Sequence, residues 1–465
     1  MSPHDAETAF RQLALDAARD EHYASVAWGV SVGGTLVHSG GEGELHDGRA
    51  PDARTVYRIA SMTKSFTSAA VLALRDEGLW SLDDPVTRHA PELAGVRAPE
   101  GSGPITLRHL LSMTAGMATD DAWADRHLDI SADEIDRIYA AGPTFAHVTN
   151  TAFEYSNLGF GMIGRAVRNA TGRPVQEHIT ERFLQPLGLH DTTWVQPAHD
   201  RWARPTRLQD DAIVDDGTAP LGDGEISPMG GLWSTVVDLS TWAAWFDAAF
   251  TRPHQPDAIG LSPASRREMQ RMHTYMGMIT LAGRTFPAGY GFGLNVRDDA
   301  TLGKVVGHSG GLPGYGSNML WVSGRGVAAV ALANTTYARM SALTTRLLVA
   351  AHEHGLVPTV SVPVSPALAA GAHGLVALLN AWDDAAATAL FADNVALDES
   401  LARRAAAAQH LIDAHGPLTL VEVHAESLTR GRVEVRGSGD TFSIDLDLAP
   451  LPGAPVQYYE VTPSA

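Results

Sequence analysis

The pattern of apolar and polar residues changes character along the chain. Residues 5–20 carry apolar positions at helical spacing, and the alternating stretches 27–32 and 35–38, split by Gly33-Gly34, predict a β-hairpin. The run from Met62 to Glu77 consists of small and apolar helix formers and stops at Gly78. Because its first turns lack a polar face, we expect a helix that is buried on most sides.

Helix and loop patterns fill residues 83–250, and strand patterns return only after residue 285. The later strands are predicted at 289–296, 305–308, 318–322 and 327–333. Strands at both ends with helices between them favour an antiparallel sheet built from both ends, with a mainly helical inserted lobe. The predicted fold class is therefore α+β.

A second domain is predicted after a proline-rich stretch. Residues 358–368 contain three prolines and few charges, which is typical of a linker. Two helical stretches follow, near 374–390 and 399–415, and then several strand-like alternations. We therefore predict a large domain over 1–357, a linker over 358–370 and a small α+β domain over 371–465.

Charge and cysteine usage exclude several functions. The net charge of −19 argues against nucleic acid or an anionic membrane as partner, because either would be repelled. The chain has no cysteine, which excludes disulfides, thiolate metal sites and cysteine nucleophiles. The acidic, amphipathic amino terminus has no continuous apolar segment, so a cytoplasmic location is expected.

Lysine is almost absent: the chain has 2 lysines, Lys64 and Lys304, against 32 arginines. Lysine can act as a base once burial lowers its pKa, whereas arginine keeps its proton. Lys64 lies one helical turn after Ser61, at the predicted start of a helix. A serine there is most often an N-cap, but with a neutral lysine beside it the hydroxyl can become a nucleophile. Lys304 follows a glycine in a turn and is expected to be solvated.

Two further motifs contain polar groups that could complete such a site. Tyr155 and Asn157 precede a predicted helix, where a tyrosine is ordinarily a packing residue but can also carry a proton to a leaving group. Asn157 could hold the lysine and offer its amide to a substrate carbonyl.

The third motif, Gly307-His308-Ser309-Gly310-Gly311, permits two interpretations. It matches the nucleophile elbow of α/β-hydrolases, although the glycines and proline that follow do not suit the helix an elbow requires. As an edge strand it would aim His308 and Ser309 into a cleft. The backbone N–H groups of Ser61 and Gly311 would then form an oxyanion hole.

Together, Ser61-Met62-Thr63-Lys64, Tyr155-Ser156-Asn157 and His308-Ser309-Gly310 resemble the three motifs of the β-lactamase and penicillin-binding-protein-like serine hydrolases. The branch is that of class C β-lactamases, D-alanyl-D-alanine carboxypeptidases, D-aminopeptidases and related esterases. The resemblance implies an αβα sandwich, with Ser61 as the acylated nucleophile and Lys64 and Tyr155 as its general bases. It also implies that Asn157 orders the lysine and that His308, Ser309 and Gly310 border the substrate.

The third motif departs from many β-lactamases, which have lysine where this chain has His308. Histidine is only partly charged near neutral pH, which weakens the case for binding a substrate carboxylate. We therefore expect a serine hydrolase or acyltransferase acting on ester or amide substrates, including peptide-like ones with a D-configured residue. The alternatives are a thioesterase that cyclises nonribosomal peptides, with a carrier protein as partner, a β-lactamase, and a non-catalytic binding module.

No cofactor and no metal are expected. His352 and His354 have the spacing of a metal pair, but no acidic cluster accompanies them. The expected partner is a small-molecule or peptide substrate.

Overall fold

Strands from the two ends of the large unit meet in one antiparallel sheet. The computed structural model describes residues 3–217, 222–252, 259–359 and 362–463. Within them, the order of the eight strands in this sheet is β2-β1-β12-β11-β10-β9-β8-β7. The strands are β1 (Ser25–Val32), β2 (Thr35–Gly43), β7 (Thr274–Leu281), β8 (Arg284–Tyr290), β9 (Asn295–Asp299), β10 (Gly303–Leu312), β11 (Tyr315–Val322) and β12 (Val327–Ala333). The pairing of β1 with β12 confirms the predicted sheet.

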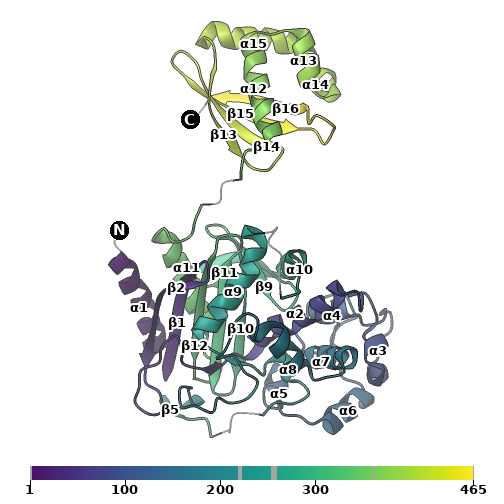
Figure 1. Cartoon of the computed structure of the whole chain (residues 1–465), viewed down its shortest axis with the longest axis vertical. Coiled ribbons are helices and arrows are strands. Elements are labelled where there is room, and N and C mark those ends of the chain that lie inside the picture. The colour runs from purple at the N-terminus through teal and green to yellow at the C-terminus, as the bar shows by residue number, and fades with distance from the viewer. Residues whose placement is uncertain (1–2, 218–221, 253–258, 360–361, 464–465) are drawn as a thin grey trace. The chain divides into compact units, whose positions relative to one another are not determined.

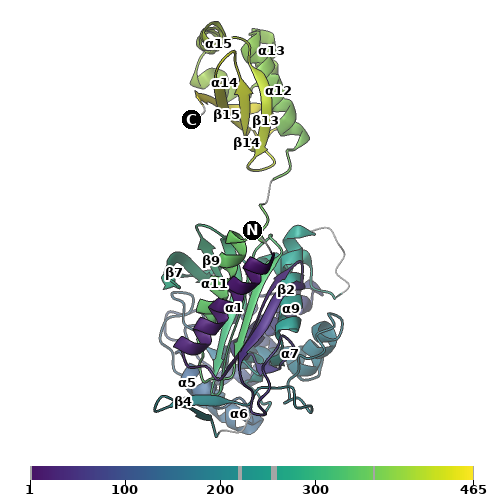
Figure 2. The ribbon, with the colours of Figure 1, turned by 90° about the vertical axis from the view of Figure 1, so that its left-hand side faces the viewer.

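Helices cover both faces of the sheet. The helices α1 (Pro3–Asp20) and α11 (Met340–Glu353) pack on one face, where Trp28 and Val30 of β1 point (Figure 2). Helix α9 (Val236–Thr251) and the helical lobe lie on the other face (Figure 1). This arrangement is an αβα sandwich, in which alternate side chains of each central strand enter two different apolar cores.

The lobe between β2 and β7 is mainly helical, as predicted. Besides α9, its described α-helices are α2 (Thr63–Asp76), α3 (Val86–His89), α4 (Leu107–Leu111), α5 (Asp121–Ala124), α6 (Ala132–Ala141), α7 (Asn157–Thr171), α8 (Val175–Ile179) and α10 (Pro263–Met269). It also contains the short strand pairs β3 (Tyr57–Arg58) with β6 (Trp233–Ser234), and β4 (Thr206–Gln209) with β5 (Ala212–Asp215).

Helix α2 is the central element of this lobe. Every residue from Thr63 to Leu74 is buried, which confirms the prediction of a helix enclosed on most sides. Phe66 stacks on Trp242 with ring centroids 3.8 Å apart, and the Trp242 indole N–H donates to Ser65 Oγ over 3.0 Å. This packing holds the start of α2 rigidly against α9.

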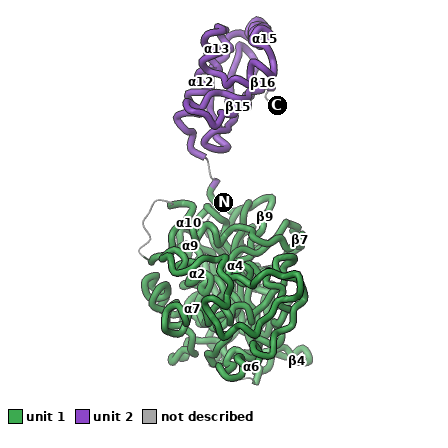
Figure 3. The backbone as a smooth tube through the Cα atoms, turned by 90° about the vertical axis from the view of Figure 1, so that its right-hand side faces the viewer, with its two compact units in different colours: residues 1–358 green, residues 359–465 purple. Residues whose placement is uncertain are grey.

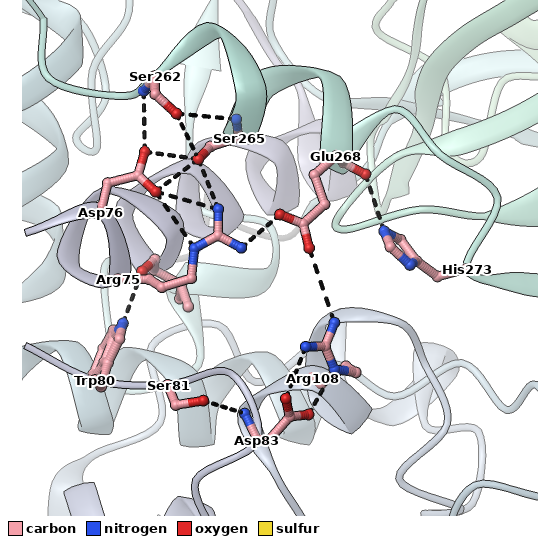
Figure 4. Close-up of polar contacts among 11 residues, drawn as sticks. Arg75, Asp76, Trp80, Ser81, Asp83, Arg108, Ser262, Ser265, Glu268 and His273 are labelled. Carbon is pink, nitrogen blue, oxygen red and sulfur yellow. Dashed lines mark hydrogen bonds and ion pairs between the residues drawn. The ribbon is translucent and has the colours of Figure 1, made fainter. Parts of the chain in front are cut away.

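A network of charges fixes the other end of α2 (Figure 4). Arg75 contacts Glu268 of α10 at 2.5 Å and donates to Ser265 Oγ at 2.7 Å. Ser265 in turn donates to Asp76 at 2.7 Å, and Arg108 of α4 lies 3.9 Å from Glu268. Burial raises the pKa of Asp76, but the hydrogen bonds from Ser265 and Ser262 and the charge of Arg75 outweigh it, so the pKa is lowered. Both ends of the helix are thereby tied to neighbouring elements.

Two parts of the strand prediction were wrong. Residues 289–296 do not form one strand: β8 ends at Tyr290 and β9 begins at Asn295. Gly293, with φ of 67°, makes the turn between them, and a Cβ on it would lie 2.5 Å from the Lys64 carbonyl oxygen. Strand β7 was not predicted, because it is an edge strand whose burial alternates only weakly.

The contacts divide the chain into two compact units, residues 1–358 and 359–465 (Figure 3). The smaller unit has a four-stranded antiparallel sheet in the order β13-β14-β15-β16. Its elements are α12 (Pro366–Asn380), α13 (Asp384–Leu390), α14 (Asp393–Asp398), α15 (Leu401–His415), β13 (Thr419–Ala425), β14 (Arg430–Arg436), β15 (Thr441–Leu448) and β16 (Val456–Pro463). No helix in the described ranges has the length and apolar character required to cross a bilayer.

The structure of this unit differs from the prediction near its start. Helix α12 begins at Pro366, inside the predicted linker 358–370, because Ser365 caps it by accepting from the Leu368 N–H at 3.0 Å. The predicted helix 374–390 is two helices, since Asp383 caps a new helix after the break. Residues 360–361 of the predicted linker lie outside the described residues.

Candidate active site

Ser61 lies in a tight turn that leads into α2. Residues Ala60–Met62 form a single 3₁₀ turn, and Ala60 has φ of 48°. Such a conformation is costly for a residue with a side chain and is found mainly where function requires it. Ser61 is not the N-cap of α2, which is Met62, and the residue is 8% exposed.

Lys64 is fully buried beside Ser61. Its Nζ lies 2.9 Å from Ser61 Oγ, 2.7 Å from Asn157 Oδ1 and 2.8 Å from the carbonyl oxygen of Met229. These three contacts match the three N–H groups of an ammonium. The lysine is therefore held in one position, with its nitrogen aimed at the serine hydroxyl.

The surroundings of Lys64 make its neutral form accessible. Burial lowers the pKa of Lys64 to about 8, and the charges of Asp121, Asp125 and Asp120 offset only part of this effect. No carboxylate among the described residues is within ion-pair distance of its nitrogen. A lysine with this pKa can accept a proton from a hydroxyl near neutral pH.

The second motif positions Tyr155 and Asn157 at the start of α7. Ser156 caps this helix by accepting from the Gly159 N–H at 3.2 Å. Asp120 adds a second cap, accepting from the N–H groups of Asn157 at 2.7 Å and Leu158 at 2.8 Å. Two side chains therefore cap the start of α7, and they hold in place the backbone that carries Tyr155.

Asn157 bridges the lysine and a carboxylate. Its Oδ1 accepts from Lys64, and its Nδ2 donates to Asp121 Oδ1 at 2.7 Å. The contact with Lys64 is the one that the sequence suggested. One of the two N–H groups of the Asn157 amide is therefore occupied by Asp121.

Tyr155 is a neutral phenol in this site. Its ring centroid lies 4.8 Å from Lys64 Nζ. Burial raises its pKa well above 10, as do Tyr290, Asp121 and Asp125, while a hydrogen bond with Ser61 acts in the opposite direction. A phenol in this state is suited to donating or relaying a proton rather than to removing one directly.

Strand β10 brings the third motif to the same place. It runs from Gly303 to Leu312 and turns directly into β11, with Leu312 paired to Tyr315. An elbow would require a helix after Ser309, so the α/β-hydrolase interpretation is wrong. Lys304, on the same strand, is exposed, as expected.

His308 is buried and uncharged. Its Nε2 lies 2.9 Å from the hydroxyl of Tyr290, which keeps the ring in place. Burial, and next the charge of Lys64, lowers the pKa of His308 to about 3. The sequence indicated a partly charged group here, and the structure shows one that stays neutral across the physiological range.

Gly310 allows β10 to approach the serine turn. A Cβ on Gly310 would lie 2.3 Å from the carbonyl oxygen of Ile59 and 2.9 Å from the Cβ of Ala60. These distances leave room for the glycine hydrogen at this position but not for a Cβ atom. The contact places the backbone of Gly311 next to the turn that carries Ser61, where an oxyanion hole would be required.

We predict that Gly310→Ala lowers kcat/KM by at least about 100-fold, because it moves β10 away from the serine turn and misplaces one donor. The measurement is kcat/KM for ester hydrolysis, and the midpoint of thermal unfolding shows whether the variant is folded. Gly103→Ala is a control for substitution of a glycine as such, since nothing lies within 4 Å of its Cβ position and its φ is not in the left-handed region. Equal effects of the two variants on kcat/KM would contradict the prediction.

The three motifs border one cleft of about 440 Å³. The described residues that line it are Ser61, Asp121, Ala122, Asp125, Phe153, Tyr155, Met276, Asn295, His308, Ser309, Gly310, Gly311 and Tyr337. All predicted site residues except the buried Lys64 and Asn157 line this cleft, and those two contact its floor. Sequence reasoning missed Asp121, Asp125 and Tyr337. The two aspartates had one signal, the acidic residues that follow the Thr-Ala-Gly-Met stretch, and Tyr337 had none.

Comparisons with known proteins find similar sequences over the large unit. The Beta-lactamase family profile matches residues 10–353. Curated relatives include the D-alanyl-D-alanine-carboxypeptidase/endopeptidase AmpH of Escherichia coli (29% identical, covering 44% of this chain and 53% of AmpH) and Esterase EstB of Burkholderia gladioli (28% identical, covering 63% and 81%). The chain thus spans about half the length of AmpH.

Solved structures share the fold. One is the octameric penicillin-binding protein homologue from Pyrococcus abyssi, with a TM-score of 0.64, 19% identity and coverage of 95% of this chain and 90% of that one. Another is a D-stereospecific amidohydrolase from Streptomyces sp., with a TM-score of 0.56, 24% identity and coverage of 74% and 97%. With the family match over most of the chain, we conclude that this protein belongs to the Beta-lactamase family.

Proposed function

We propose that this chain is a serine hydrolase or acyltransferase that acts on ester or amide substrates through a covalent acyl-enzyme. The observation that carries the proposal is the 2.9 Å contact between Lys64 Nζ and Ser61 Oγ beside an open cleft. A buried lysine with a pKa of about 8 and no ion pair among the described residues has an obvious use as a base.

Acylation would begin with neutral Lys64. Its nitrogen takes the hydroxyl proton of Ser61 as Oγ attacks the substrate carbonyl carbon. The carbonyl oxygen gains negative charge, which the N–H groups of Ser61 and Gly311 would stabilise. When the bond to the leaving group breaks, Tyr155 donates its phenolic proton to that group and recovers a proton from the Lys64 ammonium.

Deacylation would use the same groups in reverse. Water, or an amine or alcohol acceptor, attacks the acyl-enzyme while Tyr155 and Lys64 remove its proton. Ser61 Oγ leaves and takes a proton back, which regenerates the free site. The choice between water and another acceptor depends on what binds in the cleft.

The pH dependence follows from the pKa of Lys64. Because the neutral amine is the reactive form, kcat/KM for an uncharged ester should rise about tenfold per pH unit below pH 8 and level off above it. The low pKa of His308 predicts no inflection near 6.5. A pH profile with p-nitrophenyl acetate checks this, and an inflection near 6.5 without one near 8 would contradict it.

A substrate panel tests the proposal itself. It contains p-nitrophenyl esters, D- and L-amino acid anilides, a peptidyl thioester and nitrocefin, read by burst kinetics. We expect a burst with activated esters and only weak hydrolysis of nitrocefin, because the cleft lining offers no charged cation to the nitrocefin carboxylate. No turnover of any member, together with no labelling of Ser61 by a fluorophosphonate, would instead indicate a binding module.

A further inference from the structure

The cleft contains more negative charge than acyl transfer requires. Asp121 and Asp125 both line it, and no described lining residue is a lysine or arginine. Lys64 lies below the lining, with its donors already directed at Ser61, Asn157 and Met229. Asp120 has a structural role instead, because both of its carboxylate oxygens cap the start of α7.

Asp125 is buried, and no described residue forms an ion pair with it. The residue is 4% exposed, yet it lines the cleft, and among the described residues its carboxylate accepts one hydrogen bond, from the Tyr337 hydroxyl at 3.1 Å. Burial, and next Asp121, raises the pKa of Asp125 to about 7. A buried carboxylate is expected to have a charged partner, and here the open side faces the space where a substrate binds.

Tyr337 holds this carboxylate in place. The residue has φ of 53°, a strained conformation for a tyrosine, and a Cβ on Gly311 would lie 2.8 Å from its Cδ1. Tyr337 therefore contacts Asp125 through its hydroxyl and lies beside Gly311 of β10. Backbone strain of this kind is retained where the geometry has a use.

We propose that Asp125, held by Tyr337 and assisted by Asp121, binds the ammonium group of the substrate. The proposal rests on the proposed serine acyl-transfer function and gives its substrate class: acyl donors that carry a primary amine. A cation in the cleft would pair with the buried carboxylate and supply the charge that the protein itself lacks there. A substrate carboxylate in the same position would be repelled.

Matched anilides test this at pH 7, where Asp125 is partly ionised and a bound ammonium favours its charged form. One pair is alanine p-nitroanilide against N-acetylalanine p-nitroanilide, in both configurations, and the other is N-acetyllysine against N-acetylnorleucine p-nitroanilide. We expect kcat/KM for the cationic member of at least one pair to be at least about tenfold higher. N-succinylalanine p-nitroanilide, which is anionic, should be the poorest substrate.

The variant Asp125→Asn should remove most of that preference, which is read as the ratio of kcat/KM within each pair so that any change in acylation common to both members cancels. Asparagine still accepts from Tyr337. Asp133→Asn is the matched control, because Asp133 is exposed on α6 and the change in net charge is the same. Asp121→Asn provides a second variant if Asp125→Asn fails to fold.

The outcomes separate the two proposals. A preference for the cation that falls in the Asp125→Asn or Asp121→Asn variant, and not in the Asp133→Asn variant, supports the ammonium site. Two results would overturn the ammonium site but not the proposed function. One is a burst with p-nitrophenyl acetate and no preference for the cationic member of either pair. The other is a preference for the cation that persists in both Asp125→Asn and Asp121→Asn. No burst with any substrate would overturn the proposed function as well.

Discussion

Lys64→Arg is expected to lower the acylation rate by at least about 10³-fold, although it preserves the positive charge. Arginine keeps its proton at any pH a protein survives, so it cannot accept the hydroxyl proton of Ser61. The contacts at 2.7–2.9 Å around Lys64 Nζ also leave no room for a guanidinium. Pre-steady-state release of p-nitrophenol measures this step directly.

The second lysine provides the control. Lys304 is exposed, with its Nζ 5.9 Å from the centroid of the Phe250 ring, so Lys304→Arg should retain full acylation. Circular dichroism and the thermal midpoint separate loss of chemistry from loss of fold in the Lys64 variant. If folded Lys64→Arg acylated at a rate close to that of the parent, Lys64 would not be the base.

Tyr155→Phe is expected to lower kcat for an anilide by about 10²- to 10⁴-fold and to lower that for a p-nitrophenyl ester much less. An anilide leaves as an amine and requires a proton, whereas p-nitrophenolate leaves without one. Phenylalanine keeps the ring that packs 6.3 Å from Tyr290, so the change removes only the hydroxyl. The measurement is kcat for an anilide and for a p-nitrophenyl ester that carry the same acyl group, in the parent and in the variant.

A buried tyrosine outside the cleft serves as the control. Tyr139 donates to the carbonyl oxygen of Leu158 at 3.2 Å, and Tyr139→Phe should lower the free energy of unfolding by about 1 kcal/mol while leaving kcat unchanged. An equal loss of rate on the anilide and the ester in Tyr155→Phe would mean that the hydroxyl positions Ser61 and does not deliver the proton.

The motifs of the site could be predicted from the sequence because each has a local signature. Ser61 and Lys64 are three residues apart at a helix start, and Tyr155 precedes a capped helix that begins at Asn157. The order of strands, then helices, then strands was sufficient to predict a sheet built from both ends of the large unit. In the structure, β1 and β12 pair within that sheet. These features depend on short-range patterns and on simple topology.

The rest required the three-dimensional structure. Asp125 and Tyr337 are 212 residues apart in the chain and meet only across the cleft. The charge of His308 depends on how deeply it is buried, which periodicity does not reveal. Ala60 has a positive φ and lies directly beside Gly310, and neither residue type predicts this conformation or this contact. Long-range contacts and burial therefore decide the electrostatics of the site.

The central claim is that Ser61 becomes acylated during turnover. Rapid acid quench of the protein with p-nitrophenyl acetate, followed by peptide mass analysis, tests it most directly. The account predicts one acetyl group on the peptide that contains Ser61, formed at the rate of the burst and absent from Ser61→Ala. Undiminished turnover by Ser61→Ala, or an acetyl group on any other residue formed at the burst rate, would contradict it.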